Sequence, residues 1–386
     1  MNTPAAALQD LLPHMIDRDD SDPESYPKAN VQALYDSGIV AAPFAAALGG
    51  ADWRLEDAVS AIEAIAAASP STALIVSMPL GLAGVYGLGP DIAPSAHHAA
   101  WSAQMEQVAL EYRQGLIYAA CNSEKGAGGS LEATQTVATR GEDGRFRITG
   151  EKILASSGRH ASTFFSTAKV SQDDLPGAGV VEFFFVQIGS PGLEILQDWD
   201  GFGMRATESH TVRYVQAPAR DVMGFPDFLK IAQPLQYWFC LFAAIPLGCA
   251  RAMLTALGTP APHSPALRLR LSDATMRYEA MRAYLLETAA GFRAAAGPRY
   301  AARVLRAKTY VTQEAAKLCA ELFALGGGRN YRRTSRVART LADSFAGTAL
   351  RPPLTLALDN LVENFTLGTA EEWVGPEVER RREPPK

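Results

Sequence analysis

The stretch LIYAACNSEKGAGGS at residues 116–130 decides the fold, together with RFRITGEKILASSG at residues 145–158. Each stretch reads as a strand that ends in small residues, namely glycine, serine or another residue with a hydroxyl group. Such a strand end brings backbone N–H groups and hydroxyls against a ligand, because no bulky side chain stands in the way. Both strand ends therefore favour contact with a polar, planar ligand.

The region around these stretches, from Gly115 to about Met223, has the composition of a β module. β-Branched and aromatic residues alternate with polar ones, and Gly141 and Gly144 bracket a hairpin turn that needs a positive φ. Strands are predicted at residues 136–140, 145–149, 181–188 and 211–215. Short strands separated by turns predict a sandwich or barrel.

The regions on either side have the apolar spacing of helices. Before the β module, the spacing predicts a helix over residues 59–68. After it, long helices are predicted over 267–292 and 303–325, the second closed by glycines 326–328. The fold class is therefore α+β, with an N-terminal helical domain, a central β domain and a C-terminal helical bundle. Their predicted bounds are 1–114, 115–223 and 224–386, with a charged tail at 377–386 predicted to be disordered.

Composition excludes several classes of protein. The chain has 386 residues, of which 48% are hydrophobic, and a net charge of −5, which argues against a nucleic-acid partner. No basic, apolar leader is visible, and prolines and glutamines interrupt the longest apolar stretch, at 231–247, so we expect no membrane span and a cytoplasmic protein. Free, buried thiols are expected at Cys121, Cys240, Cys249 and Cys319.

Two more segments extend the pattern. QDWDGFGMRATESHT occupies residues 197–211, and GGRNY at 327–331 is followed by a helix-like segment from Arg336 to Asp343. Taken alone, the glycines of residues 123–130 could form a plain loop, and they fit neither a Walker loop nor a Rossmann turn. The four segments in this order resemble the acyl-CoA dehydrogenase family. The Trp-x-x-x-Gly-Met-Arg-Ala-Thr form is closest to the branch that also contains dibenzothiophene-type flavin monooxygenases.

The resemblance implies an FAD site and a homo-oligomer, either a dimer or a tetramer. Ser123 would place a hydroxyl at the polar edge of the flavin, and Ser156 would lie near its reactive N5 edge. Gly327 and Gly328 would contact the FAD of a neighbouring subunit. The full set of implied cofactor-binding residues is Cys121, Asn122, Ser123, Gly128, Gly129, Leu154, Ser156, Arg205, Thr207, Gly327 and Gly328. Leu154 replaces the family's usual tryptophan and leaves room beside the ring.

The catalytic base is the main departure from the family pattern. Oxidation of an acyl thioester needs a carboxylate to remove the α-proton. The two positions where the family keeps a glutamate fall at Arg351 and Trp238, so the base is unknown. Asp343 and His210 are the remaining candidates, although a structural role is expected for each, and Asp359 is expected on a helix surface. No cluster has metal-ligand spacing.

Three functions remain open on this reading. The first is an FAD-dependent acyl-CoA dehydrogenase that acts on the CH–CH bond of an acyl-CoA or other small acyl substrate and passes electrons to an electron-transfer protein. The second is a two-component monooxygenase that uses O2 and reduced flavin from a flavin reductase. The third is a non-catalytic subunit that pairs with an active homologue, which the absence of both glutamates motivates.

Overall fold

The structure is a computed structural model that describes residues 3–259, 263–294 and 296–366. Its α-helices are α1 Pro4–Ser21, α2 Lys28–Asp36, α3 Leu55–Ala68, α4 Pro70–Tyr86, α5 His98–Arg113, α6 Phe228–Ala232, α7 Leu235–Gly258, α8 Pro265–Ala290, α9 Gly297–Leu325, α10 Arg336–Ser344, α11 Ala346–Ala349 and α12 Leu354–Thr366. Short 3-10 helices span Ala46–Leu48, Pro90–Ile92, Ser95–His97, Gly158–His160, Arg205–Thr207 and Gly328–Tyr331. The strands are β1 Tyr118–Ala120, β2 Val137–Arg140, β3 Phe146–Ala155, β4 Thr163–Val170, β5 Val181–Gln187, β6 Leu193–Ile195, β7 His210–Pro218 and β8 Asp221–Val222.

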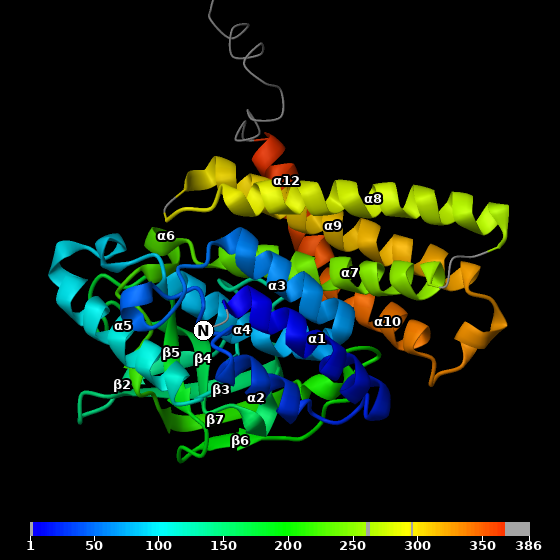
Figure 1. Ribbon diagram of the computed structural model, residues 1–386. Coiled ribbons are helices and arrows are strands. Elements are labelled where there is room, and N and C mark those ends of the chain that lie inside the picture. Colours follow the sequence, from blue (N-terminus) through cyan, green and yellow to red (C-terminus); the bar gives the residue numbers. More distant parts are fainter. Residues whose placement is uncertain (1–2, 260–262, 295, 367–386) are drawn as a thin grey trace, which may run out of the picture.

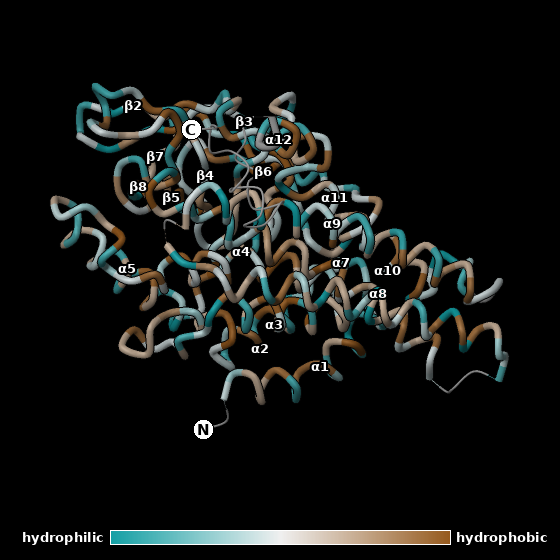
Figure 2. The backbone as a smooth tube through the Cα atoms, turned by 90° about the horizontal axis from the view of Figure 1, so that it is seen from above, coloured by the Kyte–Doolittle hydropathy of each residue, from teal (hydrophilic) through white to brown (hydrophobic). Residues whose placement is uncertain are grey.

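The described strands form one mixed sheet in the order β6-β7-β3-β2-β4-β5-β8, with β1 pairing parallel to β4. β2 and β3 are antiparallel and joined by the predicted hairpin turn, where Gly144 has a φ of +75°. The strands lie together on one side of the molecule, and α8 and α10 lie on the other (Figure 2). The predicted strands are therefore confirmed, and they belong to a single curled sheet.

The two faces of the sheet pack into different cores. Phe164 and Phe184 lie in a core enclosed by the sheet itself, whereas Phe165, Phe183 and Phe185 pack into the helical core. Successive side chains of a strand point to opposite faces, so a strand covered on both sides is apolar throughout. This accounts for the continuous aromatic run of β5 and places the helices directly against the sheet.

Helix α7 is the centre of the helical part. It packs against α3 and α4 from the N-terminal region and against α8 and α9 from the C-terminal region, and α7, α8 and α9 run side by side in Figure 1. The helix is long and apolar enough to cross a membrane, but 72% of its most apolar window is buried inside the protein. Burial at the centre of a helical core therefore accounts for its composition, and Pro246, which was expected to interrupt the stretch, lies inside the helix.

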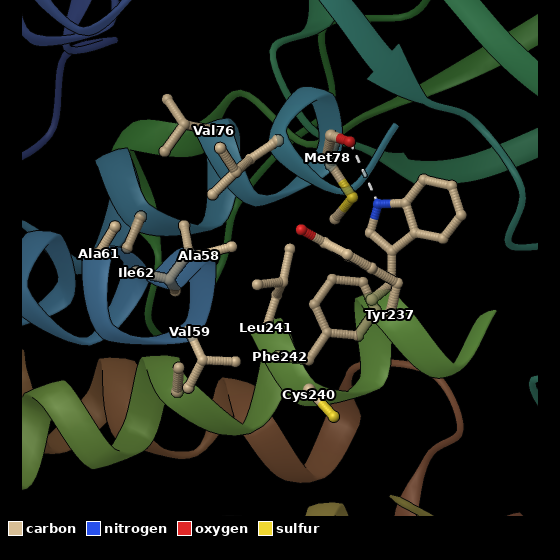
Figure 3. Close-up of a cluster of buried hydrophobic side chains, with 14 of the residues drawn as sticks. Ala58, Val59, Ala61, Ile62, Val76, Met78, Tyr237, Cys240, Leu241 and Phe242 are labelled. Atoms are coloured by element: carbon tan, nitrogen blue, oxygen red, sulfur yellow. Dashed lines mark hydrogen bonds between the residues drawn. The ribbon is translucent and has the colours of Figure 1, made fainter. Parts of the chain in front are cut away.

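The contact between α4 and α7 is close because α4 carries glycines on the facing side. The Trp238 indole N–H donates to the Met78 carbonyl at 3.1 Å, the hydrogen bond drawn in Figure 3. The side chains of α3, α4 and α7 interlock around this contact (Figure 3). The N-terminal and C-terminal helices thus share one hydrophobic core, although their sequences lie on opposite sides of the β module.

Other expectations from the sequence have clear outcomes. All four cysteines are free and buried, as predicted. Helices α3 and α9 cover the predicted segments 59–68 and 303–325, and α8 covers the predicted segment 267–292 as far as Ala290. The charged tail at 377–386 lies outside the described residues.

Candidate flavin and substrate site

A cavity of about 300 Å³ lies where the ends of β1 and β3 meet helices α4, α7 and α10. Its walls are mainly aromatic and aliphatic, and the few polar side chains come from the strand ends and from Arg351, which lies between α11 and α12. An apolar hollow with a small number of placed polar groups is the usual form of a cofactor or substrate site. We refer to it below as the central cavity.

The two strand ends that the sequence singled out do meet at this cavity. Ser123 and Ile153 form an isolated antiparallel bridge, in which the Ile153 N–H donates to the Ser123 carbonyl at 2.8 Å. The Asn122 side-chain oxygen accepts the Thr167 N–H at 3.0 Å and fixes the end of β1 to β4. Asn122 and Ser123 both line the central cavity.

Leu154 is held in an uncommon backbone conformation beside this bridge. Its φ is +59°, at an irregularity in the pairing of β3 with β7, and 51% of its surface is exposed. A positive φ is unfavourable for a bulky side chain, and such strain gathers at functional sites. The bulge turns Leu154 into the central cavity, where the sequence predicted a residue beside the flavin ring.

A chain of hydroxyl groups leads away from the cavity wall. The Ser156 and Ser209 hydroxyls lie 2.9 Å apart, and Ser209 lies 2.7 Å from the Thr207 hydroxyl, which donates to the Met204 carbonyl at 2.8 Å. Ser156 and Ser209 line the cavity, whereas Thr207 is fully buried behind them. Each hydroxyl has one proton, so Ser209 must donate to Thr207 and Ser156 to Ser209, and the cavity end of the intact chain accepts a hydrogen bond from a ligand edge.

Other predicted cofactor residues lie away from the central cavity. The Cys121 side chain is buried in the core of the sheet, and the Arg205 guanidinium pairs with Glu24 at 3.0 Å on the surface. Gly129 lines an adjoining groove, while Gly128 has no neighbour near its Cβ position. Gly327 and Gly328 follow the end of α9 and are exposed. Their predicted cofactor contacts, those across a subunit interface included, remain predictions.

Both positions at which the family keeps its glutamate do line the cavity. They hold Arg351 and Trp238, and no aspartate or glutamate of the described residues lines the cavity. His210 lies behind the wall, where its Nδ1 accepts the Trp199 backbone N–H at 3.0 Å. Asp359 is exposed on α12, as expected. The cavity therefore contains a cation where dehydrogenation would need a base.

Asp343 has the structural role that was expected, although its main partner is the backbone. Its carboxylate accepts the Met204 N–H at 2.6 Å and so ties α10 to the wall of the cavity. Burial raises the pKa of Asp343 to about 7. The Met204 hydrogen bond and the positive charge of Arg339 offset part of this rise. The side chain is absent from the cavity lining, so it does not face a ligand there.

The Asp343→Asn variant is expected to flatten the dependence of stability on pH. Because the folded protein binds the Asp343 proton more tightly than the unfolded chain does, this group stabilises the fold at acidic pH and the benefit is lost as the pH rises toward about 7. Asparagine keeps an oxygen for the Met204 N–H and has no proton to lose. Unfolding free energies at pH 5 and pH 8 should differ by roughly 2–4 kcal/mol less than in the wild type. If the difference in unfolding free energy between pH 5 and pH 8 were the same as in the wild type, the raised pKa of Asp343 would be contradicted.

Sequence reasoning missed a buried ion pair beneath the site. The Lys152 Nζ donates to Glu124 at 2.6 Å, and both side chains are almost completely buried. In β3, Phe146, Ile148 and Lys152 share one face of the strand, so the register placed a charge among core residues. A lysine on the core face of a strand needs a buried acidic partner. The position of Lys152 in the apolar alternation of β3 could therefore have indicated a partner such as Glu124.

Lys308 was also missed. It lies on the buried face of α9 and donates to the carbonyls of Leu350 and Pro352 at 2.8 and 2.7 Å. Burial lowers the pKa of this lysine to about 7. Both carbonyls flank Arg351, so Lys308 fixes the loop that carries the cation into the central cavity.

The residues present fit a flavin. The isoalloxazine ring is planar, with apolar faces and polar edges, and the cavity offers aromatic and leucine side chains together with the hydroxyls of Ser123, Ser156 and Ser209. A hydroxyl donor at a flavin edge, which Ser123 could supply, would favour the negative charge that reduction places there.

Comparison with known proteins agrees with this fit. Models of the acyl-CoA dehydrogenase N-terminal, middle and C-terminal domains match residues 4–91, 119–216 and 250–350. A putative acyl-CoA dehydrogenase, YdbM of Bacillus subtilis, is 24% identical over 87% of this chain and 88% of its own. An L-evernosamine nitrososynthase of a Micromonospora species is 29% identical over 56% of this chain and 51% of its own. KijD3, solved with FMN and a dTDP-linked amino sugar, superposes with a TM-score of 0.80 at 21% identity, covering 95% of this chain and 94% of KijD3.

Proposed function

Because the chain belongs to the acyl-CoA dehydrogenase family of flavin-dependent oxidoreductases, we propose that it is an oxygenase of that family rather than a dehydrogenase. It would use a reduced flavin, supplied by a flavin reductase, and O2. The observation that carries the proposal is the lining of the central cavity. Arg351 and Trp238 occupy the two glutamate positions, and no aspartate or glutamate in the part of the chain that the structure describes lines the cavity.

The charge at Arg351 is the chemical reason. Removal of an α-proton requires a base with a free lone pair, and a guanidinium stays protonated and has no acceptor. When bound in reduced form, flavin supplies two electrons to O2, so that one oxygen atom enters the substrate and the other leaves as water. This reaction needs no carboxylate at the position of Arg351.

The protein's own groups suit that reaction. The aromatic walls formed by Phe165, Trp238 and Phe242 exclude water from the reacting atoms. The Ser156 hydroxyl, which begins the chain through Ser209 to Thr207, can accept a hydrogen bond from an N–H at the edge of the ring. The resemblance of the sequence to the branch with flavin monooxygenases supports the same activity.

Two experiments on the purified protein test the proposal. In the first, the flavin-loaded protein is mixed without oxygen with acyl-CoAs of increasing chain length, and the visible flavin absorbance is expected to remain. In the second, the dithionite-reduced flavin complex is mixed with O2 in a stopped-flow spectrometer, and rapid reoxidation is expected. Bleaching by any acyl-CoA would instead establish dehydrogenation. A protein that binds neither oxidised nor reduced flavin would favour the non-catalytic subunit.

A further inference from the structure

Arg351 lies at the junction of two hollows. It follows α11 and precedes α12, and it lines both the central cavity and a wider neighbouring groove, as do Leu235 and Phe239. A ligand that extends from the central cavity into this groove would therefore pass the guanidinium.

The protein leaves part of this guanidinium without a partner. One Nη donates to the Gly129 carbonyl and the other to the Asn122 carbonyl at 3.3 Å. These bonds use two of the five N–H donors of an arginine. Among the described residues, no carboxylate forms an ion pair with Arg351, and Glu124, the acid whose charge influences it, is already bonded to Lys152.

A charge in this position calls for an anion from outside the chain. A partly buried cation without a counterion is unfavourable, and a guanidinium binds carboxylates through a planar fork of two parallel hydrogen bonds. The carbonyls of Asn122 and Gly129 orient the fork, and Lys308 holds the loop on both sides of it. The arginine is thus fixed in advance of binding.

The rest of the cavity describes the body of the ligand. Phe165 and Trp238 stack with their ring centres 5.6 Å apart, and Phe239 and Phe242 extend the same wall. Flat aromatic walls favour a flat, apolar molecule, and they offer no partner for a second charge.

We infer that the substrate is a small aromatic or similarly planar carboxylate, whose anionic group is bound by Arg351 while its ring lies against Phe165 and Trp238. Arg351 is then a determinant of substrate specificity. The inference rests on the oxygenase proposed above, since it places a cation and an anionic substrate group where a dehydrogenase would place its base.

Equilibrium binding tests this assignment without turnover. Benzoate, naphthoate and indole carboxylate, each beside its neutral amide, are titrated into the flavin-free and the flavin-loaded protein. Binding is followed by calorimetry and by quenching of tryptophan fluorescence, because Trp199 and Trp238 line the cavity. At least one carboxylate should bind about 10–100-fold more tightly than its amide, the usual gain from charge-assisted hydrogen bonds.

Two substitutions assign the effect to the arginine. Arg351→Gln should remove that preference, so that each carboxylate binds no more tightly than its amide. Arg351→Lys should recover only part of it, because an ammonium lacks the fork. Carboxylates that bind no better than amides anywhere in the panel would overturn the inference, as would an equal loss for both ligands in the Gln variant. Bleaching of the flavin absorbance by acyl-CoAs is measured in a separate experiment. Failure of the oxygenase proposal can therefore be distinguished from failure of the carboxylate assignment.

Discussion

Replacing Glu124 with glutamine is expected to lower the free energy of unfolding by about 3–5 kcal/mol, the usual result of leaving one member of a buried ion pair alone. The Glu124 carboxylate accepts four hydrogen bonds, from Lys152, from the backbone N–H groups of Gln135 and Thr136, and from the Thr136 hydroxyl. Burial alone would raise the pKa of Glu124, but these donors hold it below its usual value. The carboxylate is therefore ionised at neutral pH.

The glutamine cannot satisfy the same donors. Its side chain ends in one oxygen and one NH2 group, and the NH2 group would face N–H and ammonium donors. Because glutamine is neutral, the charge of Lys152 would also be left uncompensated. Because Glu124 follows Ser123 directly, the loss should also loosen the bridge between Ser123 and Ile153 that shapes the cavity. We expect weaker flavin binding together with a lower denaturant midpoint.

Two controls separate the buried pair from a general effect of charge. The double variant Glu124→Gln, Lys152→Met should recover much of the loss, since replacing both members of a buried pair is close to neutral. Glu194→Gln removes an exposed partner of Arg213 and should cost about 0–1 kcal/mol. A Glu124 variant as stable as the Glu194 variant would contradict this account.

Much of the site could be predicted because it is encoded locally. Ser123, Leu154 and Ser156 lie at strand ends that small residues mark in the sequence, and all three line the central cavity. Cys121 belongs to the same stretch, yet its side chain does not reach the cavity. Successive residues of an extended segment alternate in direction, so Ala120 and Asn122 face the cavity while Cys121 faces the core of the sheet.

The rest depends on contacts between distant segments. Arg351 meets the carbonyl of Asn122, which lies 229 residues earlier in the chain, and no local pattern marks that meeting. Its place in the cavity was reached only through the resemblance to a family that has a carboxylate there. The direction and partners of a long side chain follow from packing, which the sequence of one segment does not contain.

The Gly81→Ala variant is the second change with a large expected effect. A Cβ on Gly81 would lie 2.2 Å from the indole Nε1 of Trp238, at the contact of α4 with α7 seen in Figure 3. The indole must move, because neither helix can retreat from the shared core. Overpacking of this kind lowers the free energy of unfolding by about 1–3 kcal/mol. Loss of the hydrogen bond from the indole to the Met78 carbonyl lowers it by about 1–3 kcal/mol more.

The displaced indole has the central cavity beside it, since Trp238 forms part of the wall. We therefore expect the extra methyl group to lower flavin and ligand affinity as well as stability. Calorimetric unfolding and a flavin titration of the same preparation measure the two effects together.

A second substitution identifies the steric cause. Trp238→Leu frees the space that the added methyl group needs, so the double variant should be at least about 1 kcal/mol more stable than the sum of the single effects. Gly258→Ala is the matched control, because a Cβ there meets nothing within 4 Å at the end of α7. It should be neutral or slightly stabilising, since alanine favours a helix more than glycine does. Equal losses at Gly81 and Gly258 would mean that helix propensity, and not contact with the indole, governs this interface.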